Sequence, residues 1–278
     1  MLFRSDVLVV GGGATGRVLA RLLDHLGVAM VGAAPRASDD VSVWGHELLA
    51  IAGAAGGITA TIACSHACTC SEDASSHDLD RELRAVTARY AVSCDGAALA
   101  GDALAEAIAV DADRDARNLA WKLASVVRDG APESLLATYA EERRLSTYRG
   151  SSLSEQHGRS RIRAGDRAPD VELRAGVTLS RLLEQARFVA LFARPAPALA
   201  AELAHHGVDV AMVEGDDFAR LYPSRLGSSD LWLVRPDGHV GFVGRTDRAV
   251  DRACLAAYLS RVGLDHRADL SATRSDHE

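Results

Sequence analysis

A glycine-rich turn directly after a short apolar run is the feature that most restricts how this chain can fold. The segment Asp6–Val10 is apolar from its second residue on and leads into glycines, as a buried parallel strand would. Gly11, Gly13 and Gly16 then follow with the spacing G-x-G-x-x-G. In nucleotide-binding folds such glycines allow a tight turn, a close approach of pyrophosphate and close helix packing. The alternative is a tight strand-to-helix turn that binds no ligand.

The residues after the turn complete a β-α-β unit. Across Ala14–Leu26 the large apolar residues recur at helical spacing. Val28–Val31 is the second strand, so we expect parallel pairing and a right-handed crossover. Because a helix N-terminus attracts anions, we expect phosphates to meet the backbone of Ala14, Thr15 and Gly16.

The second strand lacks the acidic residue that usually binds a ribose. Where that acid is expected, at the strand end, the chain reads Gly32–Ala34, and Asp39 and Asp40 come only after a proline. A charge-assisted hydrogen bond of about 1.5–3 kcal/mol is therefore missing. Arg36 could instead favour a 2′-phosphate, as in NADP binders; its alternative is a solvated loop arginine.

We predict further strands and helices in the rest of the first 145 residues. Val43–Ala54 reads as a helix, Ile58–Cys70 as a strand or hairpin, and Val86–Cys94 as another strand. Asp115–Val127 and Pro132–Arg144 have helical periodicity. Together these elements predict a reduced Rossmann-like core in residues 1–145.

A second α/β domain follows a polar linker over residues 146–164. Strands and helices alternate from Phe188 to Val213, and two strands then flank the hairpin turn Pro236–Gly238. The helix Asp251–Val262 closes the domain, with Cys254 predicted to face inward. This order is that of a thioredoxin-like domain in residues 165–263, followed by a polar tail in residues 264–278.

Composition excludes several classes of partner. The 278 residues carry a formal net charge of −7 at pH 7, so we expect no nucleic acid and no anionic membrane as partner. We find no apolar stretch of the ~18 residues that span a bilayer, and no secretory leader pattern. An odd number of cysteines, 5, is no disulfide framework. We therefore expect a cytoplasmic protein.

Other residues that could carry chemistry have competing interpretations. The segment Cys64–Cys70 reads C-x-H-x-C-x-C, which could bind zinc, but an extended strand spreads such ligands too far apart. We therefore expect buried thiols and no metal. His46 could be an acid–base group at a helix start, or a partly exposed helix residue. Lys122 is expected to be a surface lysine whose stem is buried and whose ammonium reaches water.

Several segments together resemble the FAD-dependent aromatic hydroxylases of the single-component class, notably those that tailor aromatic polyketides. Besides the glycine turn, these are "ARYAVSCDGA" (Ala88–Ala97), "AGDA" (Ala100–Ala103) and the helix pair Asp115–Arg144. "GDRAPDVEL" (Gly165–Leu173) and "LVRPDGHVGF" (Leu233–Phe242) resemble the family's thioredoxin-like C-terminal domain. The thioredoxin-like domain contains no C-x-x-C motif, so we expect no thiol–disulfide exchange.

The resemblance implies a flavin site, and the departures from it imply that the site is weakened. Asp95, Gly101 and Asp102 match the motifs by which the family holds the cofactor, with Asp102 on the ribityl chain. Only Ala98 and Leu99 stand where the family inserts its substrate-binding sheet. The segment after Asp102 has neither Pro nor Gly, unlike the family's loop around the isoalloxazine. We therefore expect no tightly bound FAD, and FAD or NADP only weakly.

Three functions remain open at this point. The first is a tailoring protein of aromatic polyketide biosynthesis that acts on a polycyclic aromatic intermediate by cyclisation, dehydration or isomerisation, with Asp102 and His46 as catalytic candidates. The second is a residual FAD- and NADPH-dependent monooxygenase. The third is a non-catalytic partner of a full-length oxygenase. We expect a homodimer or a complex with an oxygenase, because loss of the substrate domain exposes apolar surface.

Overall fold

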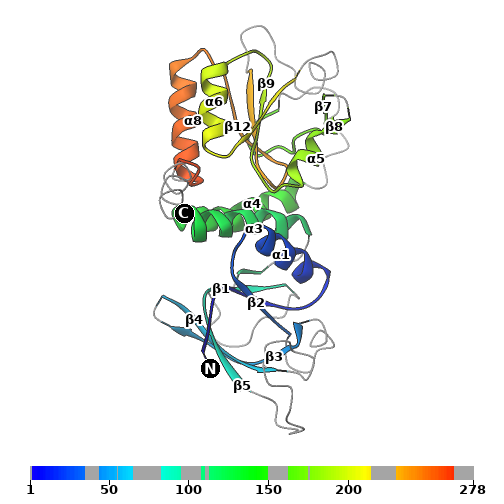
Figure 1. Cartoon of the computed structure of the whole chain (residues 1–278), viewed down its shortest axis with the longest axis vertical. Coiled ribbons are helices and arrows are strands. Elements are labelled where there is room, and N and C mark those ends of the chain that lie inside the picture. The colour runs from blue at the N-terminus through cyan, green and yellow to red at the C-terminus, as the bar shows by residue number, and fades with distance from the viewer. Residues whose placement is uncertain are drawn as a thin grey trace, which may run out of the picture. The chain divides into compact units, whose positions relative to one another are not determined.

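The computed structural model describes residues 2–34, 44–54, 56–64, 83–94, 108–109, 113–149, 162–174, 176–213 and 230–265 (Figure 1). The chain divides into two compact units, Met1–Ala120 and Trp121–Glu278. This division falls inside the helix α3 (Asp113–Arg128), whereas the sequence predicted the end of the first domain at residue 145. None of the helices in the described ranges is long and apolar enough to cross a membrane.

The first unit is built on a six-stranded mixed sheet with the order β2-β1-β5-β4-β3, in which β6 also pairs with β5. The strand β1 is central and pairs in parallel with both β2 and β5, while β3, β4 and β5 form an antiparallel meander. The elements are β1 (Leu2–Val10), α1 (Ala14–His25), β2 (Met30–Ala33), β3 (His46–Ala54), β4 (Gly57–Cys64), β5 (Leu83–Ser93) and β6 (Ile108–Ala109). The predicted β-α-β opening is confirmed.

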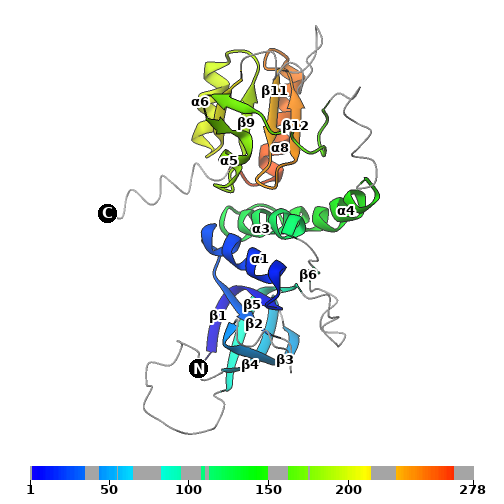
Figure 2. The ribbon, with the colours of Figure 1, turned by 90° about the vertical axis from the view of Figure 1, so that its right-hand side faces the viewer.

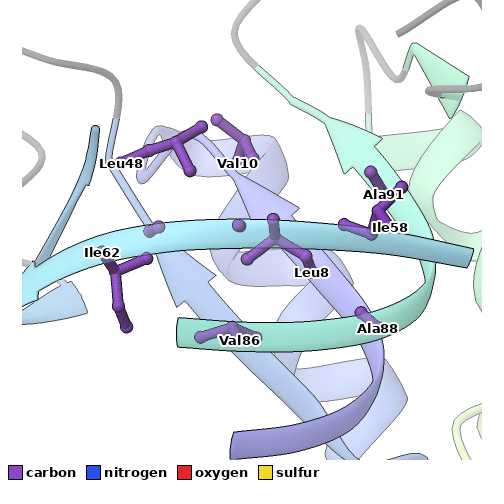
Figure 3. Packing of buried hydrophobic residues seen from close by; sticks show 10 residues of the cluster. Leu8, Val10, Leu48, Ile58, Ile62, Val86, Ala88 and Ala91 are labelled. Atoms are coloured by element: carbon purple, nitrogen blue, oxygen red, sulfur yellow. The ribbon is translucent and has the colours of Figure 1, made fainter. Parts of the chain in front are cut away.

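One face of this sheet carries a compact apolar core. Leu8 and Val10 of β1 are fully buried there, in one cluster with residues of β4 and β5, namely Ile58, Ile62, Val86, Ala88 and Ala91 (Figure 3). Ala33 of β2 and Leu48 of β3 belong to the same cluster. Because side chains alternate between the two faces of a strand, the neighbours of these residues lie on the opposite face.

The predicted helix over Val43–Ala54 is wrong: His46–Ala54 is the strand β3. Its alanine-rich sequence suits a helix, but β3 pairs with β4 along nearly its whole length, and tertiary pairing overrides such a propensity. Gly56 and Gly57 have φ values of 83° and 157°, which allow the chain to reverse between the two strands. The predicted strand from Ile58 is confirmed as far as Cys64, and residues 65–70 lie outside the described residues.

The second unit contains the helices α4 (Ser134–Arg149), α5 (Leu179–Leu183), α6 (Pro197–His205) and α8 (Ala249–Arg261). Its main sheet has the order β10-β9-β11-β12, with a parallel β9–β10 pair and antiparallel neighbours beyond it (Figure 2). The strands are β7 (Glu172–Arg174), β8 (Val177–Thr178), β9 (Val189–Phe192), β10 (Asp209–Met212), β11 (Leu231–Val234) and β12 (Val240–Gly244). This arrangement confirms the α/β thioredoxin-like fold.

One prediction of burial in this unit is wrong at the last helix. Cys254 is exposed, while Leu255, Tyr258 and Leu259 are buried as predicted. Leu264, assigned to the polar tail, is buried, and its N–H donates to Leu259 O at 3.0 Å. Gly263, with a φ of 77°, turns the chain back onto the helix end, which is a common way for helices to stop.

Candidate functional site

The glycine turn joins β1 to α1 with the geometry that its sequence predicts. Gly11 has a φ of 105°, which favours glycine, and its N–H donates to Ala33 O at 3.0 Å. The turn is thereby fixed beside the end of β2. Gly13 is the N-cap residue of α1, and no side chain of the described residues caps this helix end.

Gly16 and Gly13 have different structural reasons to be glycine. A Cβ atom on Gly16 would collide with Gly11 O, so this glycine lets the helix pack tightly against the turn. A Cβ atom on Gly13 would meet no atom of the described part of the chain within 4 Å, so none of these residues fills the space in front of it. Ala14 is exposed and Thr15 is half-buried. The uncapped N-terminus of α1 therefore has the form of a phosphate cradle.

The end of β2 explains why no side chain stands at residue 32. A Cβ atom on Gly32 would collide with the indole ring of Trp44, which lies against this glycine. Trp44 Nε1 is buried and has no hydrogen-bond partner among the described residues. His46 Nδ1 lies 3.1 Å from Gly32 O, so the histidine contacts the same strand end. His46 thus lies on β3, not at the predicted helix start.

The predicted site residues divide into those within the described residues and those outside them. Arg36, Asp95, Gly101 and Asp102 lie outside the described residues. The structure therefore brings together Gly11, Gly13, Ala14, Thr15, Gly16 and His46 at one end of the sheet. No group of three or more metal-ligating side chains occurs in the described ranges. The glycine turn and the N-terminus of α1 fit one part of an FAD molecule, its pyrophosphate.

A cluster of charged and polar side chains lies in the second unit, around the buried Lys122. This lysine, predicted at the surface, is fully buried. Its ammonium donates to Thr138 Oγ1 at 2.7 Å and lies 3.1 Å from Glu142 Oε2. Helical periodicity alone cannot distinguish such a lysine from a surface residue, because its partners come from elsewhere in the fold.

The cluster continues from α4 to the hairpin between β11 and β12. Arg235 Nη1 donates to Glu142 Oε1 at 2.8 Å, and its Nη2 donates to Asp237 Oδ2 at 2.6 Å. Trp121 Nε1 donates to the same Asp237 oxygen at 3.3 Å. The carboxylates of Glu142 and Asp237 thus both pair with cationic side chains. One chain of charged contacts connects the helix pair α3–α4 to the thioredoxin-like sheet.

Burial and charge move the pKa values of this cluster in opposite directions. Burial lowers the pKa of Lys122 from 10.5 to about 8, although Glu142 opposes the change. Burial alone would raise the pKa of Asp237, but the Arg235 guanidinium and His239 hold it well below its usual range. Burial raises the pKa of Tyr258.

Comparisons with known proteins agree with the resemblance seen in the sequence. Residues 162–263 match the family model described as aromatic-ring hydroxylase, C-terminal, and residues 111–149 match the model of an FAD binding domain. A flavin-dependent monooxygenase from Mycobacteroides abscessus is 35% identical over 186 residues, 54% of this chain and 35% of the relative. The chain thus spans about a third of that relative's length.

Solved structures show the same fold. OxyS anhydrotetracycline hydroxylase from Streptomyces rimosus has a TM-score of 0.64 at 15% identity, over 93% of this chain and 99% of that chain. The rebeccamycin biosynthetic enzyme RebC with reduced flavin has a TM-score of 0.63 at 15% identity, over 95% and 100%. The resemblance to a shortened FAD-type aromatic hydroxylase is confirmed.

The two glycines of the cradle provide a matched pair of variants. We expect Gly16→Ala to lower the free energy of unfolding by about 1–3 kcal/mol, because the added methyl group displaces the helix. Gly13→Ser is expected to keep the stability, since serine is a good N-cap residue, but its hydroxyl would occupy the place of a bound phosphate. Urea unfolding of both variants is the measurement. Equal stability of wild type and Gly16→Ala would contradict the packing argument.

The buried cluster predicts an unequal effect of two adjacent glutamates. Glu142→Gln removes the carboxylate between Lys122 and Arg235 and leaves a buried ammonium poorly compensated, so we expect a loss of about 3–5 kcal/mol. Glu141→Gln is the control, because Glu141 is exposed, and it should change the stability by less than ~0.5 kcal/mol. Chemical unfolding monitored by tryptophan fluorescence measures both. Similar values for the two variants would contradict this assignment.

The lowered pKa of Lys122 predicts a pH dependence of stability. Between pH 8 and 10 the unfolded chain binds a proton that the folded protein has lost, so this group makes the unfolding free energy rise with pH. Lys122→Met removes that contribution. We expect the difference in unfolding free energy, wild type minus variant, to increase by about 1–2 kcal/mol from pH 7 to pH 9.5. A constant difference would show that the ammonium titrates normally.

Proposed function

We propose that this protein binds a dinucleotide through its glycine turn, less tightly than a complete flavin hydroxylase does, and serves in the tailoring of polycyclic aromatic compounds. The observation that carries the first part is the open, uncapped N-terminus of α1 in front of Gly13. Backbone N–H groups at a helix N-terminus bind phosphate without any charged side chain. This part of the site needs nothing from the segments outside the described residues.

We propose that the dinucleotide binds weakly because two contacts that usually hold it, one to the ribose and one to the isoalloxazine ring, are altered. The end of β2 offers no carboxylate, since it reads Gly32–Ala34, and the ring of Trp44 excludes a side chain from the first of these positions. The loop expected after Asp102 has no proline or glycine to approach an isoalloxazine closely. FAD, if bound, would supply redox chemistry, while Gly11, Gly13 and Gly16 would hold its pyrophosphate.

We further propose that the reaction is not an oxygenation. Hydroxylation by a flavin hydroperoxide needs a dry pocket that orients the aromatic substrate. In this chain β5 ends at Ser93 and β6 begins at Ile108, and these two strands pair directly with each other. In the sequence, only Ala98 and Leu99 stand at the point where the hydroxylase family inserts its substrate-binding sheet.

The class of substrate is inferred from proteins of the same fold. OxyS is named as an anhydrotetracycline hydroxylase, and RebC as a rebeccamycin biosynthetic enzyme. We propose a polycyclic aromatic intermediate as the ligand here, with cyclisation, dehydration or isomerisation as the chemistry and Asp102 and His46 as candidate catalytic residues. A non-catalytic role beside a full-length oxygenase is the alternative, which the apolar surface left by a missing domain would favour.

We predict that the purified protein contains much less than one flavin per chain. The reason is the altered isoalloxazine loop, which takes away contacts to the largest part of FAD. The measurement is the visible absorption spectrum before and after denaturation, which releases any bound chromophore. A yellow protein with stoichiometric FAD would instead favour a residual FAD- and NADPH-dependent monooxygenase.

A further inference from the structure

The carboxylate missing from β2 has a counterpart on the neighbouring strand. Ala34, the residue after β2, forms an isolated parallel bridge with Glu47 of β3. Two backbone hydrogen bonds fix this pairing: Ala34 N–H donates to His46 O at 2.9 Å, and Leu48 N–H donates to Ala34 O at 2.8 Å. Glu47 therefore lies directly beside the end of β2.

The side chain of Glu47 projects from the same face of the sheet as that of Ala34. Residues paired side by side on two strands point to the same face, because the pleats of the strands are in register. The core supports this independently: Ala33 and Leu48 both belong to the apolar cluster on one face. The next residue after Ala33 and the one before Leu48, Ala34 and Glu47, accordingly lie on the other face.

This position is close to the glycine turn. Gly11 N–H donates to Ala33 O, so the end of β2 lies between the turn and Glu47. Glu47 is also buried, with 6% of its surface exposed. In dinucleotide-binding folds an acid at this edge of the sheet binds the ribose hydroxyls next to the pyrophosphate.

We propose that Glu47 supplies the ribose-binding carboxylate of this protein from β3, in place of the missing acid of β2. This inference rests on the proposed function, because it presumes a dinucleotide phosphate at the turn. The Glu47 carboxylate would also discriminate between ligands, because a carboxylate accepts hydrogen bonds from a free 2′-hydroxyl and repels a 2′-phosphate. An ADP-containing cofactor without a 2′-phosphate is thus the ligand class, and Arg36 does not set the preference.

The test is isothermal titration of the full-length protein with four probes: ADP, 2′,3′-dideoxy-ADP, adenosine 2′,5′-bisphosphate and inorganic pyrophosphate. We expect Glu47→Gln to weaken ADP binding by about tenfold to a hundredfold, the range of one charge-assisted hydrogen bond. Pyrophosphate binding should stay the same or become tighter, since a negative charge has been removed. The control is Asp24→Asn on α1, which removes one exposed carboxylate of the same unit and should leave ADP binding unchanged.

The wild-type protein provides a second comparison that does not depend on how well the variant folds. Dideoxy-ADP should bind about tenfold or more weakly than ADP, and adenosine 2′,5′-bisphosphate should also bind more weakly. Equal ADP affinity of wild type and Glu47→Gln, or a preference for the 2′-phosphate, would overturn the role of Glu47 alone. A wild-type protein that binds neither ADP nor pyrophosphate would overturn the phosphate cradle itself and the Glu47 proposal with it.

Discussion

The first unit depends on the pairing of β1 with a parallel strand on each side. Val7–Val10 pair with β2 and β5 at once, and all four residues are fully buried. This double pairing fixes where β1 ends and hence where the glycine turn begins. Because Gly11 is also bonded to Ala33, the N-terminus of α1 and the end of β2 cannot move independently. The phosphate recognition that we propose at this position would therefore be a property of the sheet, supplied by no single side chain.

The sequence predicted those parts of the fold that depend on local pattern. The β-α-β opening, β5, the α3–α4 helix pair and the thioredoxin-like order all follow from apolar periodicity, turn glycines and the hairpin turn at Asp237–Gly238. It did not predict features that depend on distant partners. Lys122 has the spacing of a helix-surface residue, and the two partners that make its burial tolerable, Thr138 and Glu142, come from the next helix along the chain. For the same reason the alanine-rich β3 reads as a helix until its pairing with β4 is known.

The charged cluster connects the helix pair α3–α4 to residues outside the segment that matches the FAD binding domain. Residues 111–149 match an FAD binding domain, yet their Lys122 and Glu142 connect to Arg235 in the segment that matches the hydroxylase C-terminal domain. Buried ion pairs contribute little net stability, but removing one partner is costly. Because loss of either segment would leave buried charges without partners, the cluster favours keeping both segments in one protein.

In the function that we propose, phosphate and ribose recognition depend on the fold in different ways. This difference would allow a shortened hydroxylase fold to keep part of its ligand site. A phosphate cradle consists of backbone N–H groups and glycines, so it persists wherever β1, α1 and β2 keep their packing. Ribose recognition depends on one carboxylate, and its loss costs a factor of about 10 to 100 in affinity. Such a loss can be offset by a carboxylate on an adjacent strand, provided that the strand is held in register. The Ala34–Glu47 bridge holds β3 in that register, and the turn at Gly56–Gly57 that brings β3 against β4 makes this possible.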